Sequence, residues 1–137
     1  MRVFLLYNPV AGASHGQRQA QRAAGVLTEA GWRVELVGTS GPGQAEQLAR
    51  QAAEESVDLV VACGGDGTFC QAARGLAGSG VPLGLVPAGT GNDLARSLGI
   101  AFSPGQAVRQ LLCGAASHMD LLRDRKSTRL NSSHRIR

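Results

Sequence analysis

The sequence has no apolar stretch long enough to cross a bilayer, because its longest runs, such as VDLVVAC at 57–63, are far too short. A secretory signal is not expected either. The N-terminal run MRVFLLYN meets Asn8-Pro9 early, and we interpret it as a first strand followed by a turn.

Cysteine is scarce and its spacing is uninformative. The chain has three cysteines, Cys63, Cys70 and Cys113, and no CxxC pair. An odd number without that pair argues against a disulfide framework and against a zinc site. We therefore expect reduced thiols in a cytoplasmic protein.

Excess positive charge is absent from most of the chain. Five of its 14 basic residues and one of its ten acidic residues fall in residues 124–137, which leaves nine of each in residues 1–123. A neutral body excludes nucleic acid as a partner.

The C-terminal segment differs from the body in composition. It holds the sole lysine, Lys126, and neither Gly nor Ala, and DRKSTRLNSSH resembles a sequencing-library adapter translated in frame. We expect a domain over residues 1–122 and a foreign, disordered tail over residues 123–137. A natural basic tail is the alternative.

Apolar runs and helix-forming segments alternate along residues 1–122. Strands are predicted at 2–8, 32–38, 57–63, 81–87 and 117–122, and helices at 16–31, 44–56, 68–78, 92–99 and 103–114. This order predicts an α/β fold, a three-layer α/β/α arrangement with a mostly parallel sheet. Ligands of such sheets bind at the carboxyl ends of the strands, where the loops after residues 8, 63 and 87 begin.

The loop Gly64-Gly65-Asp66-Gly67-Thr68 suits a phosphate ligand. Glycines permit positive φ and a close approach of backbone N–H groups, and a helix beginning at Thr68 would add its positive dipole end. Thr68 would cap that helix or bind a phosphate. Asp66 would repel a bare phosphate, so its presence indicates Mg²⁺ between carboxylate and phosphate. The alternative for Asp66 is a turn or helix-capping residue.

The loop containing Gly89-Thr90-Gly91-Asn92 repeats this design. It offers a hydroxyl and two glycines, and Asn92 or Asp93 would cap the next helix. The Walker P-loop is absent, and GTGNDL lacks the third glycine of GxGxxG, which weighs against a Rossmann dinucleotide site.

Three motifs, YNPVAG, CGGDGT and LGLVPAGTGNDLARSLGI, resemble in order and spacing the catalytic domain of the diacylglycerol kinase family, especially bacterial lipid kinases. The resemblance runs from Arg2 to about Leu122. GGDGT is shared with NAD kinases, whereas PAGTGND and the following helix favour lipid kinases. The resemblance implies a nucleotide-binding domain that stops before a second, β-rich domain carrying the general base.

The resemblance also implies a set of site residues. ATP would bind across the strand ends, with its phosphates on the first glycine loop and Thr90, and Asp66 would be catalytic by holding Mg²⁺. The candidate residues for binding the nucleotide are Asn8, Thr39, Gly64, Gly65, Asp66, Gly67, Thr68, Gly89, Thr90, Gly91 and Asn92. Cys70 and Gln71 stand where family members often have Asn and Glu. The contacts that the first helical turn makes in the family are therefore not carried over to these two residues.

The function that follows is ATP-dependent phosphoryl transfer to a hydroxyl of diacylglycerol or a similar lipid. The enzyme would be cytoplasmic and peripheral to the membrane, and this chain alone would bind nucleotide without turnover. An NAD kinase-like enzyme and a non-catalytic nucleotide-binding module are the alternatives. The oligomeric state stays open, with a homodimer as one candidate.

Overall fold

The part of the chain that the computed structural model describes comprises residues 1–10, 16–41, 43–88, 93–114, 116–120 and 127–131. Strands and helices alternate through it in the predicted order. The strands are β1 (Arg2–Tyr7), β2 (Arg33–Gly38), β3 (Leu59–Gly64), β4 (Leu83–Pro87), β5 (Ala116–Asp120) and β6 (Ser127–Asn131). The helices are α2 (Gly16–Glu29), α3 (Gln44–Glu54), α4 (Asp66–Leu76), α5 (Asp93–Ser97) and α6 (Pro104–Cys113).

One sheet joins all six strands in the order β2-β1-β3-β4-β6-β5. β1 pairs in parallel with both neighbours, which places Leu5 opposite Leu36 on β2 and Val61 on β3. β4 is parallel to β3 and to β6, and β5 is antiparallel to β6. Every residue of β3 is buried, as expected for an apolar strand covered on both faces of a parallel sheet.

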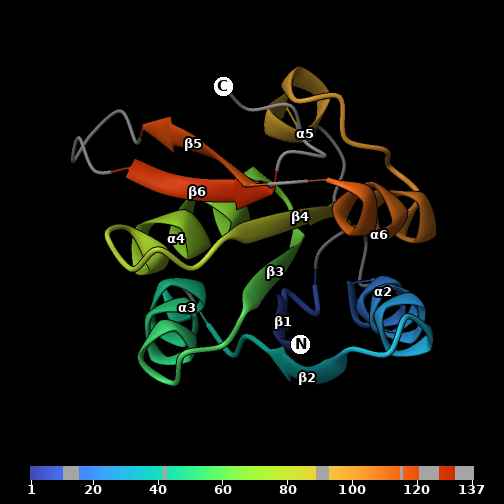
Figure 1. The fold of residues 1–137 in the computed structure, drawn as a ribbon, viewed down its shortest axis with the longest axis horizontal. Coiled ribbons are helices and arrows are strands. Elements are labelled where there is room, and N and C mark those ends of the chain that lie inside the picture. Colours follow the sequence, from blue (N-terminus) through green and yellow to red (C-terminus); the bar gives the residue numbers. More distant parts are fainter. Residues whose placement is uncertain (11–15, 42, 89–92, 115, 121–126, 132–137) are drawn as a thin grey trace.

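Helices cover both faces of the sheet. α2 and α6 pack together on one face, and α3 and α4 pack on the other (Figure 1). Two glycines permit this close packing. A Cβ on Gly75 of α4 would lie 2.3 Å from the carbonyl oxygen of Glu46, and one on Gly84 of β4 would lie 2.5 Å from a methyl carbon of Leu111. The predicted three-layer α/β/α fold with a mostly parallel sheet is confirmed.

The core is formed by leucine and valine on the strands and by alanine on the helices. Its fully buried members include Leu5, Leu6, Val60, Val61, Ala20, Ala23, Ala49, Ala52 and Ala72. None of the described helices is long and apolar enough to cross a membrane.

The C-terminal segment corrects one expectation. Residues 123–137 were predicted to be disordered, but Ser127–Asn131 forms β6. The physical basis of β6 is the row of unpaired backbone N–H and C=O groups at a sheet edge, which favours the addition of a further strand. β6 lies between β4 and β5, so the strand predicted at 117–122 has a partner along Ala116–Asp120. The foreign origin of the tail stays a prediction.

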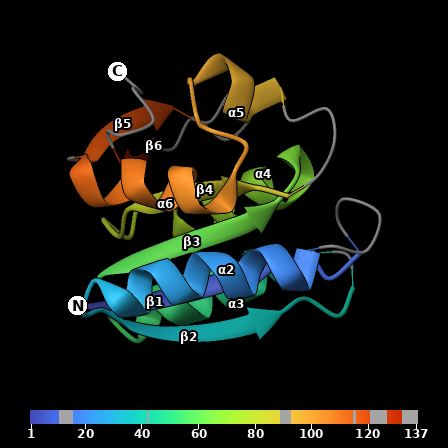
Figure 2. The ribbon, with the colours of Figure 1, turned by 90° about the vertical axis from the view of Figure 1, so that its right-hand side faces the viewer.

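The parallel strands end on one side of the molecule. Figure 2 shows the arrowheads of β2 and β3 at the same end of the sheet. Two backbone bonds join the strand ends there: the Asn8 N–H donates to the Cys63 carbonyl at 3.1 Å, and the Ala88 N–H donates to the Gly64 carbonyl at 2.9 Å. The loops that the motifs single out therefore begin at a common edge, which we call the carboxyl edge.

Candidate functional site

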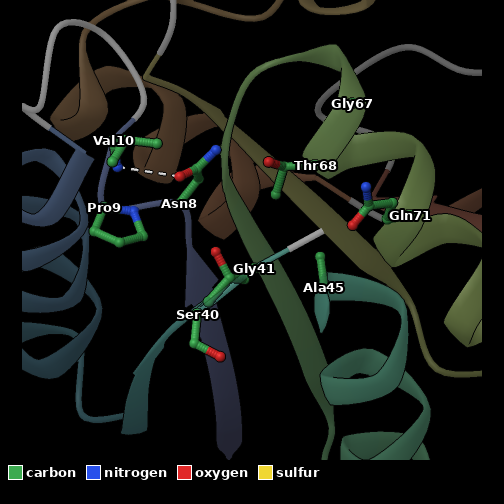
Figure 3. Close-up of a pocket in the computed structure, with 10 residues that line it drawn as sticks. Asn8, Pro9, Val10, Ser40, Gly41, Ala45, Gly67, Thr68 and Gln71 are labelled. Carbon is green, nitrogen blue, oxygen red and sulfur yellow. Dashed lines mark hydrogen bonds between the residues drawn. The ribbon is translucent and has the colours of Figure 1, made fainter. Parts of the chain in front are cut away.

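A pocket of about 430 Å³ lies at the carboxyl edge. Its volume is within the range of small-molecule sites, roughly 300–1,000 Å³. The residues that line it come from the ends of β1 and β2 and the starts of α3 and α4, and they are Asn8, Pro9, Val10, Thr39, Ser40, Gly41, Ala45, Gly67, Thr68 and Gln71. Figure 3 draws these residues around the opening and labels all of them except Thr39.

Asn8 forms the turn that ends β1 and also lines the pocket. Its side-chain oxygen accepts the Val10 N–H at 3.1 Å, which is an Asx turn (Figure 3). α2 begins close above this turn. A Cβ on Gly16 would lie 2.0 Å from the Asn8 carbonyl oxygen, so a residue larger than glycine would displace the helix start. Both interpretations of Asn8, turn residue and site residue, fit its position.

The loop from β2 to α3 places Thr39 and Ser40 at the pocket. The Thr39 N–H donates to the Tyr7 carbonyl at 2.8 Å, which continues the ladder between β1 and β2. Both the N–H and the hydroxyl of Ser40 donate to the side-chain oxygen of Gln44, the first residue of α3. Gly43 precedes α3 with a φ of 78°, a conformation that favours glycine. Ser40, Gly41 and Ala45 were not predicted as site residues.

The start of α4 corrects two predictions. The helix begins at Asp66, two residues before the predicted start at Thr68, because Gly65 is the N-cap and its carbonyl accepts the Phe69 N–H at 3.0 Å. Thr68 lies within the first turn and does not cap the helix. Positive φ is absent at Gly64, Gly65 and Gly67, and the glycines with positive φ in the described chain are Gly31, Gly43, Gly78, Gly80 and Gly99.

Gly64 and Gly67 serve different purposes. A Cβ on Gly64 would lie 2.8 Å from the Thr68 hydroxyl oxygen, so Gly64 makes room for the Thr68 side chain. Thr68 is 9% exposed and lines the pocket. Gly67 also lines the pocket, and apart from its chain neighbours and the backbone of its own helix no described atom lies within 4 Å of its Cβ position. Gly64 and Gly65 are not among the pocket-lining residues.

Asp66 binds across to the second glycine-rich segment. Its carboxylate accepts the backbone N–H of Asp93, the first residue of α5, at 2.9 Å. It is not among the pocket-lining residues. The described residues contain no cluster of three or more His, Cys, Asp or Glu side chains that could hold a metal. Gly89, Thr90, Gly91 and Asn92 lie outside the described residues.

The profile of the diacylglycerol kinase catalytic domain matches residues 2–123. The chain belongs to this family. Among curated relatives, it is 36% identical over 101 residues to a diacylglycerol kinase of Bacillus subtilis, covering 72% of this chain and 33% of the relative. It is 36% identical over 112 residues to a diacylglycerol kinase of Mycobacterium tuberculosis, covering 81% and 36%.

Solved structures agree with this assignment. A crystal structure of a diacylglycerol kinase from Bacillus anthracis superposes with a TM-score of 0.75 at 28% identity, covering 87% of this chain and 41% of that one. The chain therefore spans about a third of the length of these curated relatives and about two fifths of this solved structure. The resemblance identified from the three motifs is confirmed.

The two departures from the family pattern, Cys70 and Gln71, and the neighbouring Cys63 differ in their position relative to the pocket. Gln71 lines the pocket, one helical turn after Gly67 and Thr68. Cys70 is exposed and is not among the lining residues. Cys63 is buried at the end of β3, and this burial raises the pKa of its thiol to about 12. Of these three residues, only Gln71 is placed to touch a ligand in the pocket.

Proposed function

We propose that this chain is the nucleotide-binding part of an ATP-dependent lipid kinase and that ATP occupies the pocket at the carboxyl edge. The observation that carries the proposal is the convergence of Asn8, Thr39 and Thr68 on one pocket beside the start of α4. These three residues come from segments that are far apart in the sequence. The chain that holds them belongs to a family of kinases.

The phosphates would lie at the start of α4. The first N–H groups of a helix have no partner within the helix, and the dipole places positive charge there. Gly67 leaves this helix end open to the pocket, and the Thr68 hydroxyl is the adjacent side-chain donor. A phosphate at this position would receive backbone and hydroxyl hydrogen bonds together.

The remainder of the nucleotide would extend toward the turn after β1. Pro9 and Val10 lie on one side of the pocket, opposite Thr68 and Gln71 on α4 (Figure 3). Pro9, Val10 and Ala45 offer apolar surface, while Asn8, Thr39 and Ser40 offer polar groups between them. This mixture suits a sugar and a flat base, because small-molecule sites combine apolar walls with a few placed polar groups.

Mg²⁺ would be held mainly by the phosphates, with Asp66 as the nearby carboxylate. The Asp66 carboxylate also accepts the Asp93 N–H at 2.9 Å. The lack of an acidic cluster among the described residues fits Mg²⁺, which keeps several waters and uses one or two carboxylates with substrate phosphates. When bound, the ion would neutralise charge on the transferring phosphoryl group.

The acceptor would be the hydroxyl of a membrane lipid. This part of the proposal rests on the names of the relatives, diacylglycerol kinases of which this chain spans about a third. Phosphoryl transfer requires the acceptor to be held in line with the γ-phosphate and a base to accept its proton. We propose that this chain, which spans about a third of these relatives, binds nucleotide without catalysing the transfer.

Isothermal titration calorimetry of the 137-residue chain with ATP, with and without Mg²⁺, tests the proposal. We expect saturable binding of Mg-ATP and a lower affinity in the variant Thr68→Val. NAD serves as the competing ligand, because an NAD kinase-like protein would bind it as well. No binding of ATP at millimolar concentration would reject the proposed function, and binding of both ATP and NAD would favour the NAD kinase-like alternative.

A further inference from the structure

Three consecutive residues, Thr39, Ser40 and Gly41, form one wall of the pocket at the carboxyl edge. They follow β2, and none of them is buried: Thr39 is half-buried, and Ser40 and Gly41 are exposed. Burial therefore does little to fix this wall. A wall that becomes ordered only when a ligand binds lowers the affinity for that ligand. The affinity of the pocket should therefore depend on the hydrogen bonds that hold these three residues.

One end of the wall is held by the sheet. The Thr39 N–H donates to the Tyr7 carbonyl at 2.8 Å. This bond continues the ladder between β1 and β2, and it requires no particular side chain. It fixes Thr39 at the end of the ladder, before Ser40 and Gly41.

Ser40 and Gly41 are bound to Gln44, the first residue of α3. The side-chain oxygen of Gln44 accepts both the backbone N–H and the hydroxyl of Ser40, the hydroxyl at 2.8 Å. The backbone N–H of Gln44 donates to the Gly41 carbonyl at 3.3 Å. The two bonds from Ser40 therefore depend on the side chain of residue 44, whereas the bond to Gly41 does not.

Gln44 can hold this wall because the core fixes α3. Ala45, the next residue, is 2% exposed and also lines the pocket, and Ala49 is fully buried. Gln44 itself is not among the pocket-lining residues. An effect of its side chain on a ligand in the pocket must therefore pass through the residues that it holds.

The hydrogen bonds of Ser40 also limit what the wall offers to a ligand. A backbone N–H can only donate, so the oxygen of the Gln44 carboxamide must face Ser40. Because this oxygen can only accept, the Ser40 hydroxyl donates its single hydrogen to it. Figure 3 shows this hydroxyl directed away from Asn8 and Thr68. Ser40 therefore contributes to the pocket through its position more than as a donor, and Gln44 sets that position.

We infer that Gln44 is a positioning residue for the nucleotide. Its side-chain oxygen fixes Ser40 and so keeps the wall of Thr39, Ser40 and Gly41 in the arrangement that binds the ligand. The inference rests on the proposed function, because the ligand that it assigns to the pocket is the nucleotide. A purely structural Gln44 would stabilise the start of α3 without changing the affinity of the folded chain for the nucleotide.

Calorimetric titration with Mg-ATP tests this role. Gln44→Ala removes the acceptor and keeps a strong helix former, and we expect the affinity to fall about tenfold because the wall loses its hydrogen bonds. Gln47→Ala makes the same change at an exposed position of α3 and is the matched control. It should bind Mg-ATP as the wild type does. Equal affinities in the two variants would overturn the inference.

A double-mutant cycle tests whether Gln44 acts through Ser40. Ser40→Ala removes the hydroxyl and leaves the N–H donor, so we expect a loss of affinity of about two- to threefold. In the Gln44→Ala background the same change should cause no further loss, because two residues that act through one contact are not additive. Losses that multiply would show that the two residues act independently, which would overturn the inference.

Amide hydrogen exchange of Ser40 in the nucleotide-free chain measures the bond itself. We expect exchange about tenfold faster in Gln44→Ala, and near wild-type exchange in Gln44→Glu, which keeps a side-chain oxygen acceptor. Unchanged Ser40 exchange in Gln44→Ala would overturn the inference whether or not ATP binds. Faster exchange with unchanged Mg-ATP affinity would overturn it in favour of a structural role. Failure of the wild type to bind ATP would instead reject the proposed function.

Discussion

The two edges of the sheet each hold an aspartate that accepts a backbone N–H from a distant segment. At the amino edge, Asp58 accepts the Arg2 N–H at 2.7 Å and its own N–H donates to the Arg2 carbonyl at 2.9 Å. At the carboxyl edge, Asp66 accepts the Asp93 N–H at 2.9 Å. Asp58 thus attaches β1 to the residue before β3, whereas Asp66 joins the start of α4 to the start of α5.

The difference follows from the direction of the chain. In right-handed strand–helix–strand units, each helix that follows a strand begins at the carboxyl edge, so helix N-termini and their unpaired N–H groups gather there. The pocket is lined from that edge, by the turns after β1 and β2 and the starts of α3 and α4. The same kind of bond from carboxylate to amide therefore joins two strands at one edge and two helix starts at the other.

The largest effect should separate the two aspartates. We expect Asp66→Ala to lower the affinity for Mg-ATP by about 10²-fold, comparable to the loss of one preorganised electrostatic group. Asp58→Ala should leave that affinity unchanged, because Asp58 lies at the opposite edge of the sheet. Calorimetric titration of both variants under identical salt and Mg²⁺ concentrations measures the contrast. Similar losses in the two variants would remove the distinction between the edges.

A smaller effect is expected at the pocket wall. Thr68→Val replaces the hydroxyl by a methyl group of similar size and should lower the affinity for Mg-ATP by about tenfold, the contribution of one hydrogen bond to a charged group. Thr68→Ser keeps the hydroxyl and is the matched control. If valine and serine variants bind Mg-ATP equally well, the Thr68 hydroxyl does not contact the phosphates.

At the amino edge the expected change is in stability. Asp58→Ala removes the acceptor of the Arg2 N–H, and we expect the free energy of unfolding to fall by about 1–2 kcal/mol. Urea denaturation followed by circular dichroism measures this change. A variant as stable as the wild type would show that the bond at 2.7 Å makes no net contribution.

The smallest effects concern the thiols. Burial raises the pKa of Cys63 to about 12 from 9.0, so its contribution to stability is complete below pH 9 and is lost as the pH rises toward 12, because the unfolded chain ionises first. At pH 8 a thiol reagent should therefore label Cys70 and Cys113 in the folded chain, and Cys63 only after unfolding.

Cys70 also tests the orientation of α4. It is exposed and does not line the pocket, so saturating Mg-ATP should leave its labelling rate unchanged. Protection of Cys70 by nucleotide would place the ligand on a different face of α4 from Gly67, Thr68 and Gln71.

Much of the fold was predictable because apolar runs and helix-forming segments alternate clearly. The strand β3 and helices α2, α3 and α6 lie within one or two residues of their predicted bounds. Four of the candidate site residues, Asn8, Thr39, Gly67 and Thr68, line one pocket, and their role in binding a nucleotide stays a prediction. Gly64 was predicted to let the backbone approach a phosphate, whereas in the structure it makes room for the Thr68 side chain. Its closeness to Thr68 depends on where α4 begins, and Gly65 allows that start two residues earlier than the propensity pattern indicates.

The remaining features depend on contacts between distant segments. The bond from Asp93 to Asp66 spans 27 residues and requires the relative positions of two helix starts. Ser40 and Gly41 line the pocket because the loop after β2 turns across the edge, which no local pattern specifies. β6 could not be predicted from a segment without apolar periodicity, since its basis is the unpaired edge beside it.

The most direct test of a nucleotide site at the carboxyl edge is a titration of the ¹⁵N-labelled chain with Mg-ATP, followed by amide chemical shifts. We predict progressive shifts at Asn8, Thr39, Gly67 and Thr68, which line the pocket, and none at Arg2 and Asp58 across the sheet. Shifts confined to the amino edge, or no shifts at millimolar Mg-ATP, would contradict the assignment.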